Sequence, residues 1–349
     1  MTLRFAREVR TGSYLMPDAK GGLQEVGLTV ELRRDPLTGR SGRLAHFQGF
    51  HLHPADISEA VESSRERCPF CPERVLQVTP LLPSPLAPDG RIRHGEALLF
   101  PNISPYDRHS VVVTLTREHF VAPQSFTTTQ LADGLGAARQ YFLALAPAPR
   151  GTYSLVTWNY MPLAGATQVH AHLQAFSTDR PGGLLEEEMR RSRSFFRRRG
   201  RTFWEELVSQ ERAVGQRFLA EGRHSAWLTS FVSRSVISDV MVVFPHRQSL
   251  EELSRDAIEE FATGLVAAIR FFGEEGVVAF NLALYPAPQG ESSEHAWLHA
   301  RLSPRIYFMP SIRGSDTTSW QHLLDEPFMV RSPEALAERL RPALEAALG

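Results

Sequence analysis

Cysteine is nearly absent from this sequence, because its 349 residues include only Cys68 and Cys71. The two lie in one CPFC motif, so no disulfide framework can join distant segments and both thiols belong to a single site. The sequence also lacks the charged and then apolar leader of a signal peptide, and it lacks an apolar run long enough to span a bilayer. We therefore expect a cytoplasmic protein with no membrane partner.

An excess of either charge is missing too, because 38 basic and 39 acidic side chains give a formal net charge of −1. No overall field drives such a chain toward nucleic acid, and we expect no nucleic-acid partner. The arginines between Arg190 and Arg201 are either a local phosphate-binding patch or, as we favour, a solvated helix face paired with preceding glutamates. A hydrophobic content of 42% is typical of a soluble globular protein, and the length favours two domains.

Several segments have the patterns of regular structure. Pro36 and Gly39 mark a turn in the DPLTG motif, and the prolines of residues 79–89 mark an exposed loop. The remaining elements that we expect are a helix at 54–67, strands at 97–100 and 110–115, a helix at 129–145, a strand at 153–158 and a charged helical connector at 186–221.

Three short segments recur in the same order later in the chain, which indicates an internal duplication. Val111–Val113 recurs as Met241–Val243 and Gly134–Ala138 as Gly264–Ala268, both offset by 130 positions, and His170–Leu173 recurs as His299–Leu302, offset by 129. Each match alone is compatible with chance, but all three together are less so. We predict an α+β fold of two duplicated halves with a mainly antiparallel sheet and flanking helices, at residues 1–185 and 225–349, joined by a connector at 186–224.

The stretch from Asn159 to Ser177 is where we place the chemistry. Because side chains alternate along a strand, His170, His172 and Gln174 would share one face while the apolar residues between them fill the other. The small residues of 164–167 just before them would let backbone N–H groups approach an anion closely. A lone pair of histidines in a strand is more often structural than catalytic, so the interpretation depends on the motifs that accompany it.

The CPFC motif favours a zinc site over a redox dithiol, because prolines follow both cysteines and no thioredoxin-like βαβ pattern surrounds them. A closed zinc site needs four nitrogen or sulfur ligands, so two more must come from elsewhere, and histidine is the obvious supplier. His119 and His170 are placed to tie the cysteines to the catalytic strand. His94 and His109 remain alternatives on pattern alone.

Taken together, these segments resemble the galactose-1-phosphate uridylyltransferase branch of the histidine-triad superfamily. The resemblance runs from about residue 31 to 345 and is weak in the second half. Its motifs are DPLTG from Asp35, CPFC from Cys68, FPN from Phe100, TREH ending at His119, and NYMPLAGATQVHAHLQ from Asn159 to Gln174.

The resemblance implies a role for each matching residue. Cys68, Cys71, His119 and His170 would match the zinc ligands of that branch. His172 would match the nucleophile that attacks the α-phosphorus of a nucleoside-diphosphate sugar, and Gln174 the glutamine that hydrogen-bonds the phosphate. The substrate-binding residues would be Asn102, which contacts the nucleoside, Asn159, and the phosphate loop of Gly165, Ala166 and Thr167. The resemblance also implies two histidine-triad-like halves and a homodimer.

The predicted function is that of a nucleotidyltransferase that moves a nucleoside monophosphate from a nucleoside-diphosphate sugar to a sugar 1-phosphate or to phosphate, through a covalent nucleotidyl-His172. Glutamine at position 174 favours transfer over hydrolysis, since it is a poor proton donor to a leaving group. The alternatives are a phosphorylase of an ADP-sugar or a dinucleoside polyphosphate, and a nucleotide-binding protein without turnover.

The chain departs from the branch in its second half. Arg301 and Ala287 stand where histidines of a second metal site are expected, although Glu188 and His299 match loosely, and we predict no second metal. Residues 311–326 replace the hexose-binding segment, which puts galactose 1-phosphate in doubt as acceptor. Arg301 and Arg305 are candidates to bind a substrate phosphate, with a structural salt bridge as the equal alternative.

Overall fold

The computed structural model describes residues 2–18, 21–45, 52–146, 148–290 and 294–349. Its centre is a ten-stranded sheet in which all neighbouring strands are antiparallel. From edge to edge the strands are β4 (Ile92–His94), β5 (Ala97–Pro101), β6 (His109–Thr114), β8 (His172–Thr178), β7 (Tyr153–Tyr160), β12 (Ala279–Tyr285), β13 (His299–Arg305), β11 (Val240–Val243), β10 (Ala226–Thr229) and β9 (Phe218–Glu221). The predicted α+β fold with mainly antiparallel strands is confirmed.

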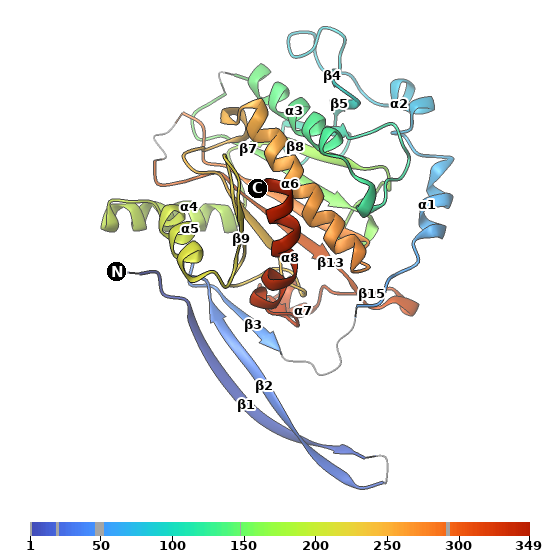
Figure 1. The fold of residues 1–349 in the computed structure, drawn as a ribbon. Helices are drawn as coiled ribbons and strands as arrows, with labels where there is room; N and C mark the ends of the chain where they lie inside the picture. The colour runs from blue at the N-terminus through green and yellow to red at the C-terminus, as the bar shows by residue number, and fades with distance from the viewer. Residues whose placement is uncertain (1, 19–20, 46–51, 147, 291–293) are drawn as a thin grey trace.

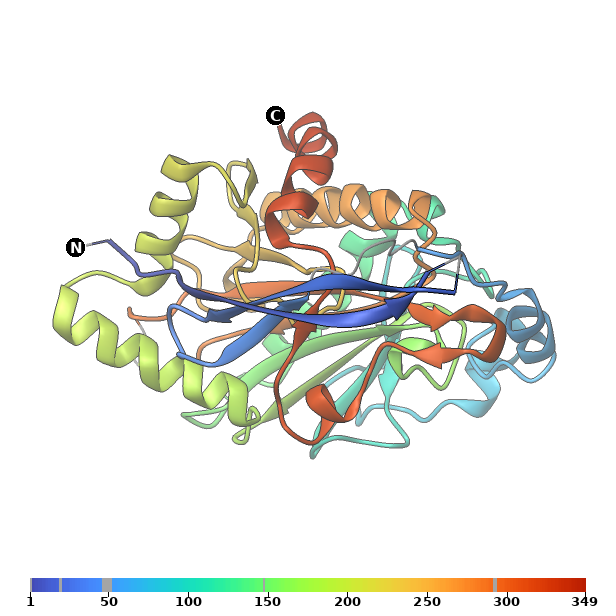
Figure 2. The same ribbon diagram turned by 90° about the horizontal axis from the view of Figure 1, so that it is seen from below.

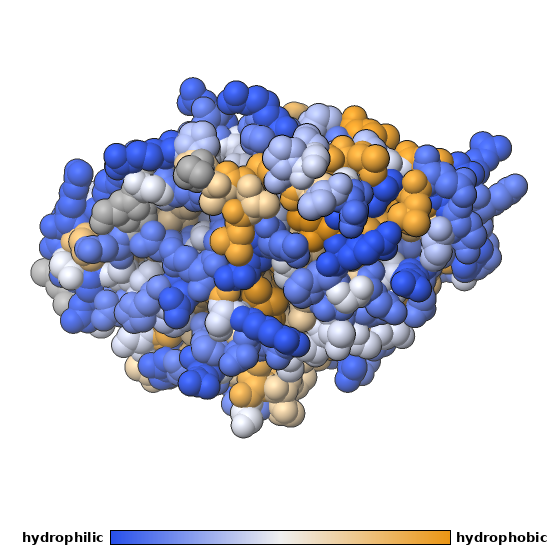
Figure 3. Space-filling model, turned by 90° about the horizontal axis from the view of Figure 1, so that it is seen from above, coloured by the Kyte–Doolittle hydropathy of each residue, from blue (hydrophilic) through white to orange (hydrophobic). Residues whose placement is uncertain are grey.

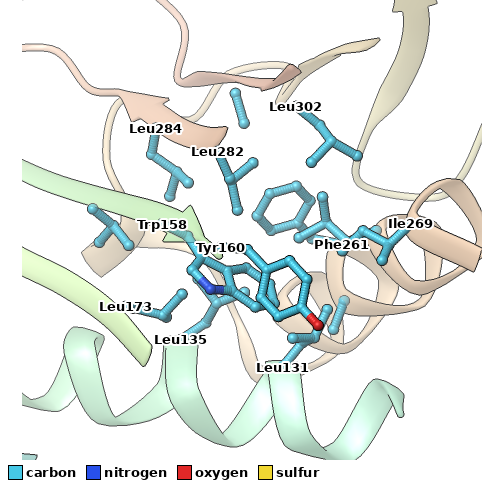
Figure 4. Close-up of a cluster of buried hydrophobic side chains, with 14 of the residues drawn as sticks. Leu131, Leu135, Trp158, Tyr160, Leu173, Phe261, Ile269, Leu282, Leu284 and Leu302 are labelled. Atoms are coloured by element: carbon cyan, nitrogen blue, oxygen red, sulfur yellow. The ribbon is translucent and has the colours of Figure 1, made fainter. Parts of the chain in front are cut away.

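Three helices cover one face of this sheet: α3 (Thr128–Ala144), α6 (Arg255–Glu274) and α8 (Pro333–Leu348) (Figures 1 and 2). The first begins with a capping box, in which the Thr127 hydroxyl accepts from the Gln130 N–H and the Gln130 side chain accepts from the Thr127 N–H. Between helices and sheet lies the main core, where Leu131 and Leu135 of α3 meet Trp158 of β7 and Leu173 of β8 (Figure 4). The opposite face of β8 is therefore left for polar side chains.

A second, four-stranded sheet joins the two ends of the chain. Its order is β1 (Ala6–Pro17), β2 (Leu23–Arg34), β3 (Ser41–Ala45) and β16 (Phe328–Met329), with β16 parallel to β3. The predicted DPLTG turn links β2 to β3, and the Asp35 carboxylate accepts from the N–H groups of Leu37 and Thr38. We call the paired strands β1 and β2 the arm, because they extend away from the body of the molecule (Figure 1).

The remaining elements are short segments or lie at the periphery. They are the helices α1 (Ser58–Arg65), α2 (Pro72–Val78), α4 (Gly183–Arg199), α5 (Phe203–Val214) and α7 (Ser319–His322), and the strands β14 (Tyr307–Met309) and β15 (Gly314–Ser315). None of the helices in the described ranges combines the length and the apolar composition that crossing a membrane requires.

Most of the expected elements are present with ends shifted by a few residues. The predicted helix at 54–67 is the shorter α1, and the charged connector is two helices, α4 and α5, separated at Gly200 by its left-handed φ of 71°. Arg190 and Arg191 of α4 lie 3.5 and 3.7 Å from the Glu187 carboxylate, as the helix-face interpretation requires. The arm has no counterpart among the predicted elements.

The strand order of the ten-stranded sheet is symmetric about the central β7–β12 pair. In the first half β5, β6, β8 and β7 are neighbours, and in the second half β10, β11, β13 and β12 occupy the same relative places. The helices α3 and α6 occupy corresponding positions in the chain order, each before the strand at the junction. The division into duplicated halves at 1–185 and 225–349 stays a prediction, which this symmetry favours.

Candidate active site and metal centre

Two cysteines and two histidines from separate segments meet in one buried cluster. Cys68 follows α1, Cys71 is the residue before α2, His119 lies in the loop after β6, and His170 lies just before β8. Their ligand atoms all lie within 4.8 Å of one another, and none of the four side chains is more than 8% exposed. The predicted ligand set is therefore brought together, while the alternatives His94 and His109 are exposed and outside it.

The distances in this cluster fit a zinc ion. Cys71 Sγ lies 3.4 Å from His119 Nδ1 and 3.7 Å from His170 Nδ1, and Cys68 Sγ lies 3.7 Å from His170 Nδ1. Zinc bonded tetrahedrally to sulfur and nitrogen would separate two such ligand atoms by about 3.6 Å. The four residues could thus hold zinc with little rearrangement.

The far sides of both imidazole rings are fixed by backbone carbonyls. His119 Nε2 donates to Val61 O at 3.0 Å, and His170 Nε2 donates to Thr116 O at 2.9 Å. A carbonyl oxygen can only accept, so the ring proton is on Nε2 and the lone pair of each Nδ1 points into the cluster, which is the tautomer that metal binding requires.

Without a metal ion, burial disfavours both the protonated form of the histidine rings and the thiolate form of the cysteines. It lowers the pKa of His170 to about 4, which keeps the ring neutral. Burial, followed by the neighbouring Cys68 thiol, raises the pKa of Cys71 to about 12. A dication in the cluster would supply the positive charge that favours the thiolate.

His172, the first residue of β8, follows His170 by two residues, and its ring is held by the backbone of His170. Its Nδ1–H donates to His170 O at 2.8 Å, which leaves Nε2 as the ring nitrogen available to a ligand. Burial lowers the pKa of His172, so the imidazole is neutral at neutral pH. Phe70, between the two cysteines, lies edge-on to it with 5.1 Å between ring centroids.

A cavity of about 270 Å³ opens beside His172. Both predicted catalytic residues and five of the predicted substrate-binding residues line this cavity. They are His172, Gln174, Asn102, Asn159, Gly165, Ala166 and Thr167. The structure thus brings together residues from β7, β8, the loop before β8 and the residue after β5 at the polar face of the sheet.

The loop before β8 presents backbone donors, but only one of the three that the sequence indicated, Thr167, is among them. The N–H groups of Gly165 and Ala166 donate to the carbonyls of Pro162 and Met161, within the turn itself. Across the described residues no acceptor is recorded for the N–H groups of Thr167 and Gln168, and both residues line the cavity. An anion in the cavity would therefore accept hydrogen bonds from the backbone N–H groups of Thr167 and Gln168. Gly165 contributes by adopting the φ of 90° that the turn requires.

The same loop begins with backbone strain. Met161 is not glycine and yet has a φ of 69°, and its side chain is buried. Conformations of this kind cost about 1–3 kcal/mol and persist only where the surroundings fix them. Here the Met161 carbonyl accepts from the N–H groups of Ala164 and Ala166, which closes the turn.

Asn102 has a fixed acceptor and an unused donor. Its side-chain oxygen accepts from the Ser104 N–H at 2.9 Å, while its Nδ2 is buried without a partner among the described residues. That amide lies in the cavity wall, so it is oriented to donate to a ligand.

Gln174 is joined to the second half of the chain through amides that the sequence did not single out. Asn159 Nδ2 donates to Gln174 Oε1 at 3.5 Å, and Asn281 Nδ2 of β12 donates to Asn159 Oδ1 at 2.7 Å and to Ala164 O at 2.8 Å. Arg305 in turn donates to Asn281 Oδ1 at 3.1 Å. The one feature of the sequence that could have identified Asn281 is its polar side chain within an otherwise apolar strand.

Arg301 lies apart from the His172 cavity. Its guanidinium is buried on β13 between Glu188 and Asp239, at 3.6 and 3.9 Å, and donates to Ser230 Oγ at 3.0 Å. Arg305 forms a close ion pair with Asp316, with Nε 2.9 Å from Oδ1. Both arginines form ion pairs, as the alternative expected, and Arg301 does not line the His172 cavity, so its predicted contact with substrate stays a prediction.

Comparisons with known proteins agree with this architecture. No family model matches the sequence. An uncharacterized protein of Archaeoglobus fulgidus is 26% identical over 287 residues, which are 82% of this chain and 83% of that protein.

Solved structures superpose over most of the chain. The GalT-like protein of Arabidopsis thaliana has a TM-score of 0.68 at 15% identity, over 89% of this chain and 98% of that one. An ADP-glucose phosphorylase of Arabidopsis thaliana, solved with bound ADP-glucose, has a TM-score of 0.69 at 14% identity over the same shares. A uridylyltransferase has 0.66 at 18% identity, over 91% and 99%. The chain therefore has the uridylyltransferase-type fold that the resemblance implied.

Proposed function

We propose that this protein is a nucleotidyltransferase that acts on a nucleoside-diphosphate sugar through a covalent nucleotidyl-His172. The observation that carries the proposal is the position of His172. Its ring is held at Nδ1 by the His170 carbonyl and stands in the cavity together with Gln174 and the loop of Gly165–Thr167. The solved structures of the same fold support it, because they include a uridylyltransferase and an ADP-glucose phosphorylase.

The first step is a displacement at the α-phosphorus. The lone pair of His172 Nε2 forms the phosphorus–nitrogen bond, the bond from phosphorus to the bridging oxygen breaks, and the sugar 1-phosphate leaves with that electron pair. The Nδ1–H donates to the His170 carbonyl throughout and stabilises the positive charge that develops on the ring. Gln174 and the N–H groups of Thr167 and Gln168 would donate to the phosphate oxygens.

The second step reverses the first with another acceptor. A phosphate oxygen of the acceptor attacks the same phosphorus, the phosphorus–nitrogen bond breaks and Nε2 recovers its lone pair. Zinc bound by Cys68, Cys71, His119 and His170 would hold the His170 segment, whose carbonyl orients the nucleophile. We further propose that the chain works as a homodimer in the cytoplasm.

Either a sugar 1-phosphate or inorganic phosphate can be the acceptor in this scheme. The changed segment at 311–326 favours phosphate, because it replaces the hexose-binding segment of the uridylyltransferase branch. The phosphorylase is therefore the second candidate, and the two differ only in the molecule that discharges the intermediate.

Intact mass measured after incubation with UDP-glucose or ADP-glucose tests the proposal. We expect one nucleoside monophosphate per chain, labile to acid, on the wild-type protein and none on His172→Ala. The matched control is His109→Ala, an exposed histidine outside the cavity, which should form the adduct like wild type.

Chasing the isolated adduct then identifies the acceptor. Release by phosphate would identify a phosphorylase, and release by a sugar 1-phosphate other than glucose 1-phosphate would identify a transferase. Glucose 1-phosphate reverses the first step in either enzyme and does not distinguish them. If no donor labels a protein that contains its full zinc, the covalent mechanism is wrong and the chain is a nucleotide-binding protein without turnover.

A further inference from the structure

A hollow of about 680 Å³ lies on the four-stranded sheet, and most of its charged side chains are basic. Of its ten lining residues two are glutamates and five are arginines, namely Arg4, Arg7, Arg10, Arg34 and Arg43. This sheet includes the arm and lies at the lower end of the body in Figure 1, away from the face shown in Figure 3. None of the ten residues lines the His172 cavity, so this feature, which we call the arginine hollow, is a separate site.

The pairing of the strands places three of these arginines on one face of the sheet. Leu32 of β2 is paired with Glu8 of β1 and with Arg43 of β3. Side chains alternate between the two faces of a strand, so Arg34, two residues after Leu32, points to the same side. The same holds for Arg10, two residues after Glu8. The register of the sheet therefore gathers these guanidinium groups over one outer surface.

The two carboxylates of the arginine hollow are already engaged. Arg10 Nε lies 2.9 Å from Glu8 Oε1, in an exposed ion pair. Arg43 Nε lies 3.3 Å from Glu326 Oε1, and Ser41 Oγ donates to Glu326 Oε2 at 2.6 Å. Each glutamate thus faces one arginine of the hollow, and neither neutralises a third.

The remaining three arginines have no carboxylate at ion-pair distance within the described ranges; they are Arg4, Arg7 and Arg34. On the buried side of β2 the chain pairs its arginine closely, because Arg33 lies 2.7 Å from Glu31 and 2.9 Å from Glu334. Five guanidinium groups and two carboxylates give the hollow a net charge of +3, although the whole chain carries −1. Like charges gathered in one hollow repel one another, so a bound anion would stabilise them.

The chemistry of the hollow indicates a ligand with phosphate groups. A guanidinium group binds a phosphate through two parallel hydrogen bonds, and a phosphate monoester carries a charge of about −1.5 to −2 on three acceptor oxygens. Linked phosphates in one small molecule therefore match a charge of +3 in a compact hollow. An acidic peptide would spread its charge over residues about 3.3 Å apart, and only Ala6 and Leu32 offer apolar contacts to it.

We propose that the arginine hollow binds a small molecule that carries two or more linked phosphate groups. The nucleotidyl transfer proposed above takes place at His172 and does not need this second site, so the inference goes beyond that function. Its test measures binding at the four-stranded sheet. It can therefore fail while the transfer at His172 stands, and it can succeed if the transfer is refuted.

Trp320 provides an optical signal for binding. The guanidinium carbon of Arg43 lies 4.9 Å from the centroid of the Trp320 ring, which is 47% exposed, whereas the other four tryptophans are at most 7% exposed. Tripolyphosphate, a probe without a base or sugar, should draw on the Arg43 guanidinium and change the tryptophan fluorescence saturably, with one site per chain. The variant Trp320→Phe should lose this signal, while calorimetry should still detect binding.

Charge reversal at Arg34 tests the hollow itself. Arg34→Glu should weaken tripolyphosphate binding by roughly a hundredfold, because it removes one guanidinium group and adds a repelling carboxylate. Arg34→Lys, which keeps the charge but not the two-pronged geometry, should weaken it by roughly tenfold or less. The matched control is Arg93→Glu, which makes the same charge change at an exposed residue of β4 outside the hollow and should bind like wild type. Since Arg34 and Arg93 are exposed, all three variants should keep the wild-type unfolding temperature.

The ligand class is tested with other anions at constant ionic strength. Sulfate and inorganic phosphate should bind much more weakly than tripolyphosphate, because each presents a single tetrahedral anion. Sulfate that binds as tightly as tripolyphosphate would reduce the hollow to a site for adventitious ions. A single-stranded oligonucleotide that binds wild type but not Arg34→Glu, when tripolyphosphate binds neither, would make nucleic acid the occupant. Either result, or equal weakening in Arg34→Glu and Arg93→Glu, would overturn the proposal.

Discussion

At the scale of single residues, the site depends on one carbonyl and one aromatic ring. The His170 carbonyl accepts from His172, while the His170 ring belongs to the cysteine cluster, so a single residue connects this cluster to the proposed nucleophile. Phe70 adds a second connection, because it stands between the cysteines and contacts the rings of both His170 and His172. A change in the cysteine and histidine cluster should therefore reach His172 within one or two contacts.

Replacing one thiol tests this cluster. The variant Cys71→Ser should lose most of its bound zinc and unfold at a lower temperature, because a hydroxyl is a poor zinc ligand and three ligands hold the ion weakly. Zinc is measured by elemental analysis of protein purified from zinc-supplemented medium. His94→Ala, which removes a histidine outside the cluster, is the control and should keep one zinc per chain. Full zinc in Cys71→Ser would refute the ligand set.

At the scale of elements, two strands of the second half and the residue after β15 support the loop before β8. Asn281 on β12 donates both to Asn159 on β7 and to the Ala164 carbonyl in the loop before β8. Arg305 on β13 donates to the side-chain oxygen of Asn281, and Asp316, which follows β15, forms an ion pair with Arg305. This series of contacts fixes the side chain that reaches Gln174, so Asn281 is a positioning residue.

The variant Asn281→Asp separates positioning from folding. The variant keeps an oxygen that can accept from Arg305 but loses the N–H group that donates to Asn159 and Ala164. The loop before β8 and the Asn159 side chain that contacts Gln174 are then no longer held in place. We expect adduct formation in a single turnover to slow by roughly a hundredfold, as for a small misplacement of a reacting group, with zinc content and unfolding temperature near wild type. Equal slowing in Thr317→Val, which removes the hydroxyl that accepts from Arg305, would show that the effect is not specific to Asn281.

The motifs near the chemistry were predictable from sequence, and the supports around them were not. The CPFC motif indicated a zinc site that needs two further ligands, but the pattern alone left His94 and His109 open beside His119 and His170, and the resemblance to the uridylyltransferase branch selected the last two. Alternation along a strand placed His172 and Gln174 on one face. Asn281 could not be identified, since its role depends on the pairing of β7 with β12, 122 residues apart in sequence. The arm was missed although Val26, Leu28, Val30 and Leu32 recur at every second position of β2, because the sequence of its partner strand β1 has no such alternation and both strands are mostly exposed.

At the scale of the whole molecule, the two halves of the chain share one sheet and one core. The strands β7 and β12 pair at the centre of the ten-stranded sheet, and their aromatic side chains meet across the junction. Phe280 of β12 stacks on Tyr160 with 4.7 Å between ring centroids and lies edge-on to Trp158 at 4.8 Å. Because these rings belong to the same buried cluster as α3 and α6, neither half can leave the other without exposing them.

This junction predicts that the protein unfolds as one cooperative unit. Far-ultraviolet circular dichroism and tryptophan fluorescence should give coincident denaturant transitions, since Trp158 lies in the first half and Trp227 in the second. Phe280→Ala should lower the unfolding free energy by about 3–5 kcal/mol, because it leaves a cavity between Trp158 and Tyr160, and should move both signals together. Leu323→Ala, at a side chain 74% exposed, should change stability by less than about 0.5 kcal/mol. Two separated transitions, with only one moved by Phe280→Ala, would instead mean that residues 1–185 and 225–349 fold as independent domains.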